Sequence, residues 1–301
     1  MQIIMEPNLS RLTSLCLGGT ALAEIRLENP ADFEVWQPVA EKTGGTAKIL
    51  GGGSNLLIAD TRPGEYLPWV ILRPMYGNSA PPKISAEDGA TATIKAGSGT
   101  PLPTLLSWCA KQGLSGLEGL AGIPGNLGGA IAMNAGAYGD NTGPLLQKIT
   151  VFTPGRGLHQ RLQGEWEYAY RNFKLLPTED FFILAEAELN LTKSTSEKVQ
   201  ATILANLHSK KASQPLNLHT AGSVFKNPEQ DLAWRLLDQA GLRGARVGGI
   251  FFTEKHANFM ANDKTGTFAQ AMELLQMAEE AVQRQSGIKL ETEIKVWSCQ
   301  L

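Results

Sequence analysis

The feature that most constrains this chain is the clustering of its glycines. The sequence has 32 glycines in 301 residues, and many of them fall in two stretches, residues 49–57 and 116–143. Glycine lets the backbone adopt left-handed angles and lets a ligand approach closely. Neither stretch contains GxGxxG or GxxxxGK[ST]. A nucleotide that binds here therefore binds through a fold other than the Rossmann fold or the P-loop.

The first stretch, ILGGGSNLL, places three glycines between a short apolar strand and further apolar residues. Successive amides in such a segment can form an anion-binding nest, and the serine and asparagine can add side-chain hydrogen bonds. The alternative is a plain strand–turn–strand, but three glycines in a row weaken a turn without helping a hairpin. We favour ligand binding, and the residues concerned are Gly51, Gly52, Gly53, Ser54 and Asn55. We expect glycine to be needed at positions 52, 53 and 128 because a side chain there would enter the ligand space.

The second stretch combines small residues with little periodicity, so we predict a long shaped loop over 116–143 with at most one short strand. Small residues leave a slot for a flat ring, and free amides can line it. A glycine-rich loop under packing constraint explains the composition equally well. The residues that could line the slot are Gly122, Ile123, Pro124, Gly128, Gly129 and Ala132.

A third motif, AGSVFKNP at residues 221–228, places Ser223 beside Lys226 and Asn227. A serine becomes a nucleophile when a histidine and a carboxylate orient it, and His219 and His256 are available, so a hydrolase is an open alternative. The GxSxG signature is absent, however. A helix-capping serine near residue 231 is another alternative. The four histidines show no HxH or HxxxH spacing, so we expect no metal site.

Composition narrows the class of protein. Hydrophobic residues make up 43%, charged residues 19%, and the formal net charge is -2. We therefore expect two globular domains and no nucleic-acid partner, because no basic field would grip a phosphate backbone. The sequence has no uninterrupted apolar run of about 20 residues, so we expect no insertion into a membrane. Three widely spaced cysteines and the absence of a basic-then-apolar leader favour a cytoplasmic protein without disulfides.

Periodicity and breaker residues predict a mixture of helices and strands, which makes the chain α+β. The predicted helices cover residues 30–42, 101–111 and 196–211, together with one that Thr267 and Gln270 begin as a capping box and Gly287 ends. The predicted strands cover residues 23–28, 47–50, 70–72, 92–95, 147–153, 181–191 and 288–297. A change of composition at SQPLNLHT indicates a domain junction near residue 213.

These strings, in their order and spacing over residues 8–296, resemble the UDP-N-acetylenolpyruvoylglucosamine reductase (MurB) family. The two glycine stretches look like its flavin-binding loops. Tyr170-Arg171 looks like the motif that supplies an active-site arginine. QP, AGSVFKNP and KHANF look like its substrate-domain signature, and LETEIKV like its terminal strand with the catalytic glutamate. Asn172, the preceding GEWEYA and the terminal KVWS depart from the usual family text.

The resemblance implies a fold and a division of the chain. Residues 1–212 would form an FAD-binding domain of two α+β subdomains, of the PCMH/vanillyl-alcohol-oxidase type. Residues 213–301 would form an α+β substrate-binding domain. No room exists between Gly222 and the terminal strand for a substrate-closing insertion, so the chain resembles the shorter, second type of the family.

The implied reaction is reduction of UDP-N-acetylglucosamine enolpyruvate to UDP-N-acetylmuramate for peptidoglycan. NADPH would reduce non-covalently bound FAD, and the substrate would then receive a hydride at C3 and a proton at C2. The catalytic residues would be Arg171 for the substrate carboxylate, Glu293 as its hydrogen-bond donor and Ser223 as the proton donor to C2. In an alternating strand Glu291 and Glu293 share a face, so only the family pattern chooses Glu293.

The implied substrate-binding residues are Lys211, Lys226, Asn227, His256 and Asn258. For Lys211, a solvated helix end is as good an explanation as contact with a diphosphate or nicotinamide. Two further classes of protein stay open: a flavin oxidase of the same fold that acts on another substrate, and a non-catalytic flavoprotein. No histidine or cysteine in either glycine loop offers a covalent flavin tether, which favours the reductase.

Overall fold

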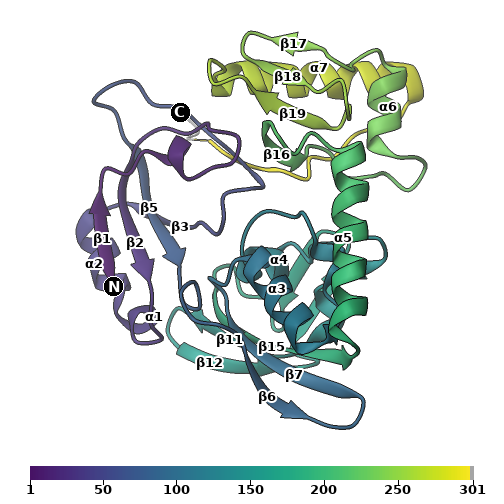
Figure 1. The fold of residues 1–301 in the computed structure, drawn as a ribbon. Coiled ribbons are helices and arrows are strands. Elements are labelled where there is room, and N and C mark those ends of the chain that lie inside the picture. Colours follow the sequence, from purple (N-terminus) through teal and green to yellow (C-terminus); the bar gives the residue numbers. More distant parts are fainter. Residues whose placement is uncertain (299–301) are drawn as a thin grey trace. The chain divides into compact units, whose positions relative to one another are not determined.

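The computed structural model describes residues 1–298, and these divide into two compact units. The first unit holds residues 1–5, 23–52 and 69–209, and the second unit holds residues 6–22, 53–68 and the chain from 210 onward. Each unit is thus assembled from segments that are far apart in sequence. The elements of both are labelled in Figure 1.

One part of the first unit is a four-stranded sheet in the order β1-β2-β5-β3, in which β3 and β5 run parallel. Its strands are β1 (Gln2–Met5), β2 (Ala21–Leu27), β3 (Thr46–Ile49) and β5 (Leu67–Pro74). The helix predicted over 30–42 is in fact two short helices, α1 (Asp32–Val35) and α2 (Gln37–Thr43). Pro38 explains the break, because proline has no amide to bond to the preceding turn. Gly44 ends α2 in the left-handed conformation, as predicted.

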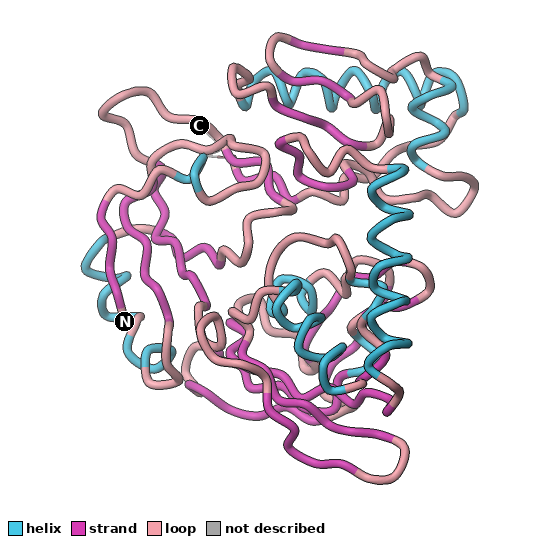
Figure 2. The backbone as a smooth tube through the Cα atoms, viewed as in Figure 1, coloured by secondary structure: helices cyan, strands magenta, loops and turns pink. Residues whose placement is uncertain are grey.

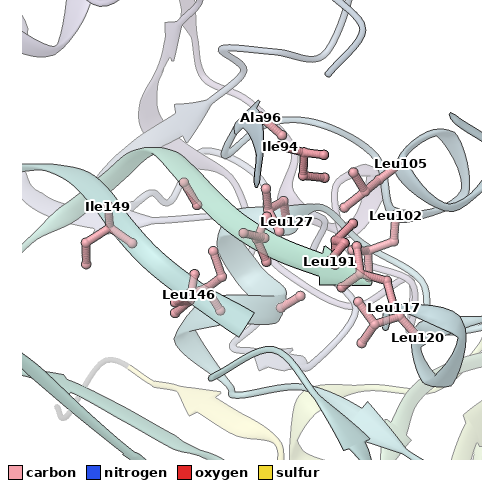
Figure 3. Close-up of a cluster of buried hydrophobic side chains, with 14 of the residues drawn as sticks. Ile94, Ala96, Leu102, Leu105, Leu117, Leu120, Leu127, Leu146, Ile149 and Leu191 are labelled. Carbon is pink, nitrogen blue, oxygen red and sulfur yellow. The ribbon is translucent and has the colours of Figure 1, made fainter. Parts of the chain in front are cut away.

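The other part of the first unit is a six-stranded sheet in the order β12-β11-β15-β7-β6, with β8 also paired to β15. Its strands are β6 (Lys83–Glu87), β7 (Thr91–Gly97), β8 (Leu114–Ser115), β11 (Leu146–Thr153), β12 (Gly157–Leu162) and β15 (Ile183–Lys193). Helix α3 (Leu102–Gln112) lies against this sheet (Figure 2). Leucines from α3, β11 and β15 meet in one buried cluster (Figure 3). The predicted strands and the helix ended by Gly113 are confirmed.

Residues 116–143 are more ordered than the long loop we predicted. They form η2 (Glu118–Leu120), α4 (Leu127–Ala132), β9 (Gly136–Ala137), β10 (Asp140–Asn141) and the start of η3 (Gly143–Leu145). Asn126 caps α4 by accepting a hydrogen bond from the Gly129 amide. Leu127 and Ile131, one helical turn apart, bury their side chains in the core. Two glycines between them hide this helical spacing in the sequence.

The second unit contains a four-stranded sheet in the order β16-β19-β18-β17 and a two-stranded parallel pair, β20-β4. Its strands are β4 (Leu56–Ile58), β16 (His219–Ser223), β17 (Arg246–Val247), β18 (Ile250–Phe252), β19 (Phe259–Asn262) and β20 (Lys295–Trp297), and its helices are η1 (Leu9–Arg11), α6 (Ala233–Gln239) and α7 (Phe268–Ser286). The predicted capping box at Thr267 and the left-handed Gly287 are both confirmed on α7. Leu15, Leu17 and Leu57 join the core of this unit.

The terminal strand predicted over 288–297 is wrong for most of its length. Only β20 is a strand, and residues 291–294 pair briefly with the segment after β16 through the Phe225–Thr292 bridge. The Lys226 amide bonds to the carbonyl of Glu291, and the Lys295 amide then bonds to the carbonyl of Asn55. The segment thus changes partner within four residues, which leaves each ladder too short for a continuous strand.

Helix α5 (Ser196–Ser213) spans the boundary between the units at residues 209–210 and confirms the helix predicted over 196–211. Neither α5 nor any other helix within residues 1–298 is long and apolar enough to cross a membrane.

Candidate active site

The two glycine loops of the first unit touch each other. A Cβ atom added to Gly52 would lie 2.5 Å from the Cα atom of Gly125, and one added to Gly51 would lie 2.9 Å from the side-chain oxygen of Asn126. Gly125 has φ +117°, where other residues are strained. Glycine is therefore required in both loops so that the two backbones can meet.

The same loops carry backbone amides with no hydrogen-bond acceptor in the described part of the chain. These amides belong to Gly51, Gly52, Gly122, Gly125 and Asn126. Neighbouring amides that lack protein partners form a nest of partial positive charge, which suits the oxygens of a phosphate. The residues present therefore fit a dinucleotide held by its diphosphate on these loops.

The rest of the second glycine loop is packed into the protein. Gly128 donates its amide to the Ser98 carbonyl over 2.8 Å, and a Cβ there would lie 2.8 Å from the Ser98 Cβ. Ile123 packs against the hydrophobic core, whereas Pro124, Gly129 and Ala132 are exposed. The reason we gave for glycine at 52 and 128 needs correction, because a side chain would strike protein atoms at both positions.

The first glycine motif is divided between the two units. Gly53, Ser54 and Asn55 belong to the second unit, where a Cβ on Gly53 would overlap the Leu12 carbonyl oxygen. Asn55 donates its side-chain amide to the Glu293 carbonyl over 3.2 Å. This division could not be predicted from the sequence, because the motif is continuous along the chain.

Ser223 ends β16 at a β-bulge in the pairing with β19. Gly222 before it has φ +79°, and a Cβ on Gly222 would lie 3.9 Å from the Ser54 carbonyl oxygen. The Glu293 amide bonds to the Val224 carbonyl over 2.7 Å. The second unit therefore gathers the serine, the glutamate and the Ser54-Asn55 segment in one place. A bulge is a common device for re-aiming a single side chain at a site.

The structure distinguishes the two glutamates that sequence alternation could not. Glu291 lies 2.5 Å from the Lys226 ammonium, and its side chain is 74% exposed. Glu293 is half-buried, with its backbone joined to Val224 and Asn55. Lys226 is thus engaged by Glu291, and Glu293 is the glutamate beside the serine strand.

The hydrolase alternative finds no support in this geometry. Within residues 1–298 no hydrogen bond joins Ser223 to a histidine. His219 lies 3.3 Å from the Cys16 sulfur. The His256 ring packs against Phe259 with centroids 4.8 Å apart, and burial lowers the pKa of His256, with the Arg243 charge adding to the effect.

Several predicted substrate contacts have structural partners. Asn258 is 3% exposed, and its side chain accepts from the Phe225 amide and donates to the Phe225 carbonyl. The Asn227 side chain accepts from the Ala233 amide at the start of α6. Lys211 is exposed, and its carbonyl accepts from the Lys255 ammonium. The Asn258 bonds hold the backbone two residues after Ser223, and the Asn227 bond ties that residue to the start of α6.

Arg171 occupies the tight turn between β13 (Trp166–Ala169) and β14 (Asn172–Leu175) and has φ +55°. Its guanidinium donates to the Gly136 carbonyl over 3.3 Å and lies 4.9 Å from the Tyr170 ring centroid. An arginine whose backbone has left-handed angles is strained, and this conformation persists only where the surrounding structure enforces it.

Asn134 is the residue that supports this turn, and the sequence analysis missed it. It is buried with φ +40°, donates to the Ala169 carbonyl over 2.9 Å and accepts from the Gly143 amide over 2.8 Å. Its place in the AMNAGAYG string, which follows the second glycine loop, was the only available signal.

Comparison with known proteins finds family models, sequence relatives and a solved structure that match this chain. A family model described as the C-terminal domain of UDP-N-acetylenolpyruvoylglucosamine reductase matches residues 214–297, and one described as an FAD binding domain matches residues 21–162. The chain is 42% identical over 299 residues to the UDP-N-acetylenolpyruvoylglucosamine reductase of Nitratidesulfovibrio vulgaris, and 42% identical over 301 residues to that of Oleidesulfovibrio alaskensis, covering 99% of each chain in both pairs. The crystal structure of the Thermus caldophilus enzyme (MurB) matches with a TM-score of 0.78 and 31% identity, over 99% of this chain and 98% of that one.

Proposed function

The chain belongs to the UDP-N-acetylenolpyruvoylglucosamine reductase family, and we propose that it reduces UDP-N-acetylglucosamine enolpyruvate to UDP-N-acetylmuramate with electrons from NADPH. It is an oxidoreductase with an FAD-binding domain. The observation that carries the proposal is the joining of the Ser223 strand, the Glu293 segment and Asn55 in one unit. In this proposal the enzyme works in the cytoplasm, is of the shorter type and divides near residue 212 into cofactor and substrate domains.

FAD, when bound, supplies the transfer of a hydride from the nicotinamide to the substrate. The amides of Gly51, Gly52, Gly122 and Gly125 would hold its diphosphate, because they have no acceptor among residues 1–298. Ser54 and Asn55 would add side-chain hydrogen bonds, and the exposed surface at Pro124, Gly129 and Ala132 would adjoin the ring.

Arg171 binds the substrate carboxylate in this proposal. A guanidinium presents two parallel N–H groups to a carboxylate and keeps its charge throughout. Its strained turn supports the assignment, since backbone strain concentrates at functional sites. As charge develops on the carboxylate during reduction, a protonated Glu293 donates a second hydrogen bond to it, and fixed donors of this kind lower the barrier most where water is excluded.

Ser223 donates the proton to C2. A hydroxyl is a weak acid, so it acts only where an enol-like carbon accepts the proton as it forms. The bulge at Gly222 aims Ser223, and buried Asn258 fixes the backbone that follows. For this reason we propose that Asn258 and Asn227 position the backbone that follows Ser223. Exposed Lys211, together with Lys226 and His256, contributes to binding the UDP portion of the substrate.

The experiment that tests the function follows the flavin through both half-reactions without oxygen. The purified protein should be yellow and should release its flavin on heating. NADPH should bleach the flavin band, and the enolpyruvyl substrate should then restore it. UDP-N-acetylglucosamine, which lacks the enolpyruvyl group, is the matched control and should leave the band bleached. A band that the substrate does not restore would overturn the proposal and favour a flavin enzyme for another substrate.

A further inference from the structure

We propose that Cys16 and His219 form a reactive thiol pair, a modification site for hydroperoxides that is separate from the reductase chemistry. The Cys16 sulfur lies 3.3 Å from Nδ1 of His219, within the second unit. Both side chains are partly exposed. A thiol at this distance can pass its proton to an imidazole, and the thiolate, not the thiol, is the nucleophile.

The backbone holds Cys16 in place for this contact. Cys16 has φ +57°, which is strained for any residue with a side chain. The Cys16 amide donates to the Thr13 carbonyl, and the side chain of buried Asn262 donates to the Leu15 carbonyl over 3.0 Å. Asn262 is also the strand partner of His219. One residue therefore fixes the backbone on both sides of the sulfur–imidazole contact.

Cys109 provides the contrast within the same chain. It is 1% exposed in the core of the first unit, and burial raises the pKa of its thiol to about 12. A thiol in that setting is protonated and shielded, so it should be inert. Cys109 therefore serves as the unreactive reference for Cys16.

The proposed step is a two-electron oxidation. The Cys16 thiolate attacks one oxygen of hydrogen peroxide, an S–O bond forms, and the O–O bond breaks. The leaving hydroxide takes the proton held by His219 and departs as water. Sulfur is oxidised to a sulfenic acid while the peroxide is reduced, and an added thiol reverses the change.

The test compares the alkylation rate of Cys16 by iodoacetamide in the native protein with its rate in the urea-unfolded chain at the same pH. Partial burial alone can only slow the native rate, so a native rate about tenfold faster reports activation by the fold. Native Cys109 should be far slower than unfolded Cys109. Peptide mass spectrometry keeps these sites apart from Cys299. After treatment with hydrogen peroxide, dimedone should label Cys16.

His219→Asn should bring the native Cys16 rate down to or below the unfolded rate and abolish dimedone labelling. His208→Asn, at an exposed histidine on α5, is the matched control and should change neither. A native Cys16 that reacts no faster than the unfolded chain would overturn the proposal, and so would a His219→Asn protein that labels as the wild type does. Neither readout depends on flavin or on turnover, so the proposed reductase function is tested separately.

Discussion

At the scale of single residues, the site depends on a few positions where the backbone leaves its ordinary conformations. Gly222 has φ +79° before Ser223, and Arg171 and Asn134 have positive φ without being glycine. Left-handed angles at residues with a Cβ cost about 1–3 kcal/mol and are retained where neighbours enforce them. Sequence patterns predicted Arg171 and Ser223 as site residues. They did not predict Asn134, and they predicted Asn258 as a substrate contact and not as a support, because a buried asparagine bonded to a distant backbone leaves no periodic trace.

Removing the Ser223 hydroxyl should separate binding from completion of the reaction. Ser223→Ala should retain FAD and be bleached by NADPH at the wild-type rate. Return of the flavin band with enolpyruvyl substrate should slow by about 10²–10⁴-fold, because no acid delivers the proton to C2. Stopped-flow absorbance of each half-reaction measures this. Ser223→Cys should recover part of the rate. Ser286→Ala, which removes a hydroxyl bonded to the Val282 carbonyl near the end of α7, is the control. Wild-type reoxidation in Ser223→Ala would remove the assignment.

The depressed pKa of His256 should make stability depend on pH. Burial among aromatic rings, together with the Arg243 charge, favours the neutral imidazole in the folded state, so the unfolded chain binds a proton more readily. The contribution of neutral His256 to the free energy of unfolding is fully present above pH 6.5, the ordinary pKa of histidine. It is lost as the pH falls through the lower pKa of His256 in the folded state. The thermal midpoint should therefore fall on acidification below pH 6.5. His256→Phe should flatten that fall, whereas His208→Phe at an exposed site should not. Equal slopes in all three proteins would contradict the argument.

At the scale of elements, short segments with few partners were the hardest to predict. Strands β7, β11 and β15 and helices α3, α5 and α7 followed from periodicity, Gly113, Gly287 and the capping box at Thr267. Apolar and polar residues alternate over 288–294, but this segment has no continuous partner strand. The strand predicted from alternation alone is therefore wrong there. The short helix α4 was missed for a different reason: two glycines hide its helical spacing, and its first amides bond to Ser98 and Thr100 from elsewhere in the chain. Local patterns predict an element only where its partners run alongside it for several residues.

The first glycine motif gives a test at this scale. In Gly53→Ala the new Cβ would overlap the Leu12 carbonyl oxygen and also sit at φ +65°. Gly64→Ala is the matched control in the same unit, since Gly64 has φ +84° but nothing within 4 Å of its Cβ position. The free energy of unfolding of the control should fall by about 1–2 kcal/mol, from the cost of its backbone angle alone. Gly53→Ala should lose clearly more in urea unfolding, because its side chain would strike the Leu12 carbonyl and not only enter the ligand space. Equal losses would show that the loop relaxes around the clash.

At the scale of the whole molecule, the chain is interleaved in a way that its sequence does not reveal. The predicted boundary at 212–213 lies close to the change of unit at 209–210, because a composition change marks it. Residues 6–22 and 53–68, however, belong with the C-terminal segment. Leu15, Leu17 and Leu57 are at most 4% exposed in that core, and β4 supplies the parallel partner of β20. Contacts across some 200 residues cannot be read from spacing, so one cut in the chain cannot separate the two units.

A fragment of residues 213–301 therefore should not fold by itself. The fragment lacks three leucines, and burying each would contribute about 1.5–3 kcal/mol of stability. Together they approach the ~5–15 kcal/mol free energy of unfolding of a typical domain. We expect weak helical circular dichroism and no cooperative transition in urea. The matched control joins residues 6–22 and 53–68 by flexible linkers to residues 210–301, which restores the leucines and β4. That chain should gain helix and unfold cooperatively. Cooperative unfolding of the bare fragment would mean that the C-terminal core closes without the N-terminal segments, and residues 213–301 would then be an independent domain.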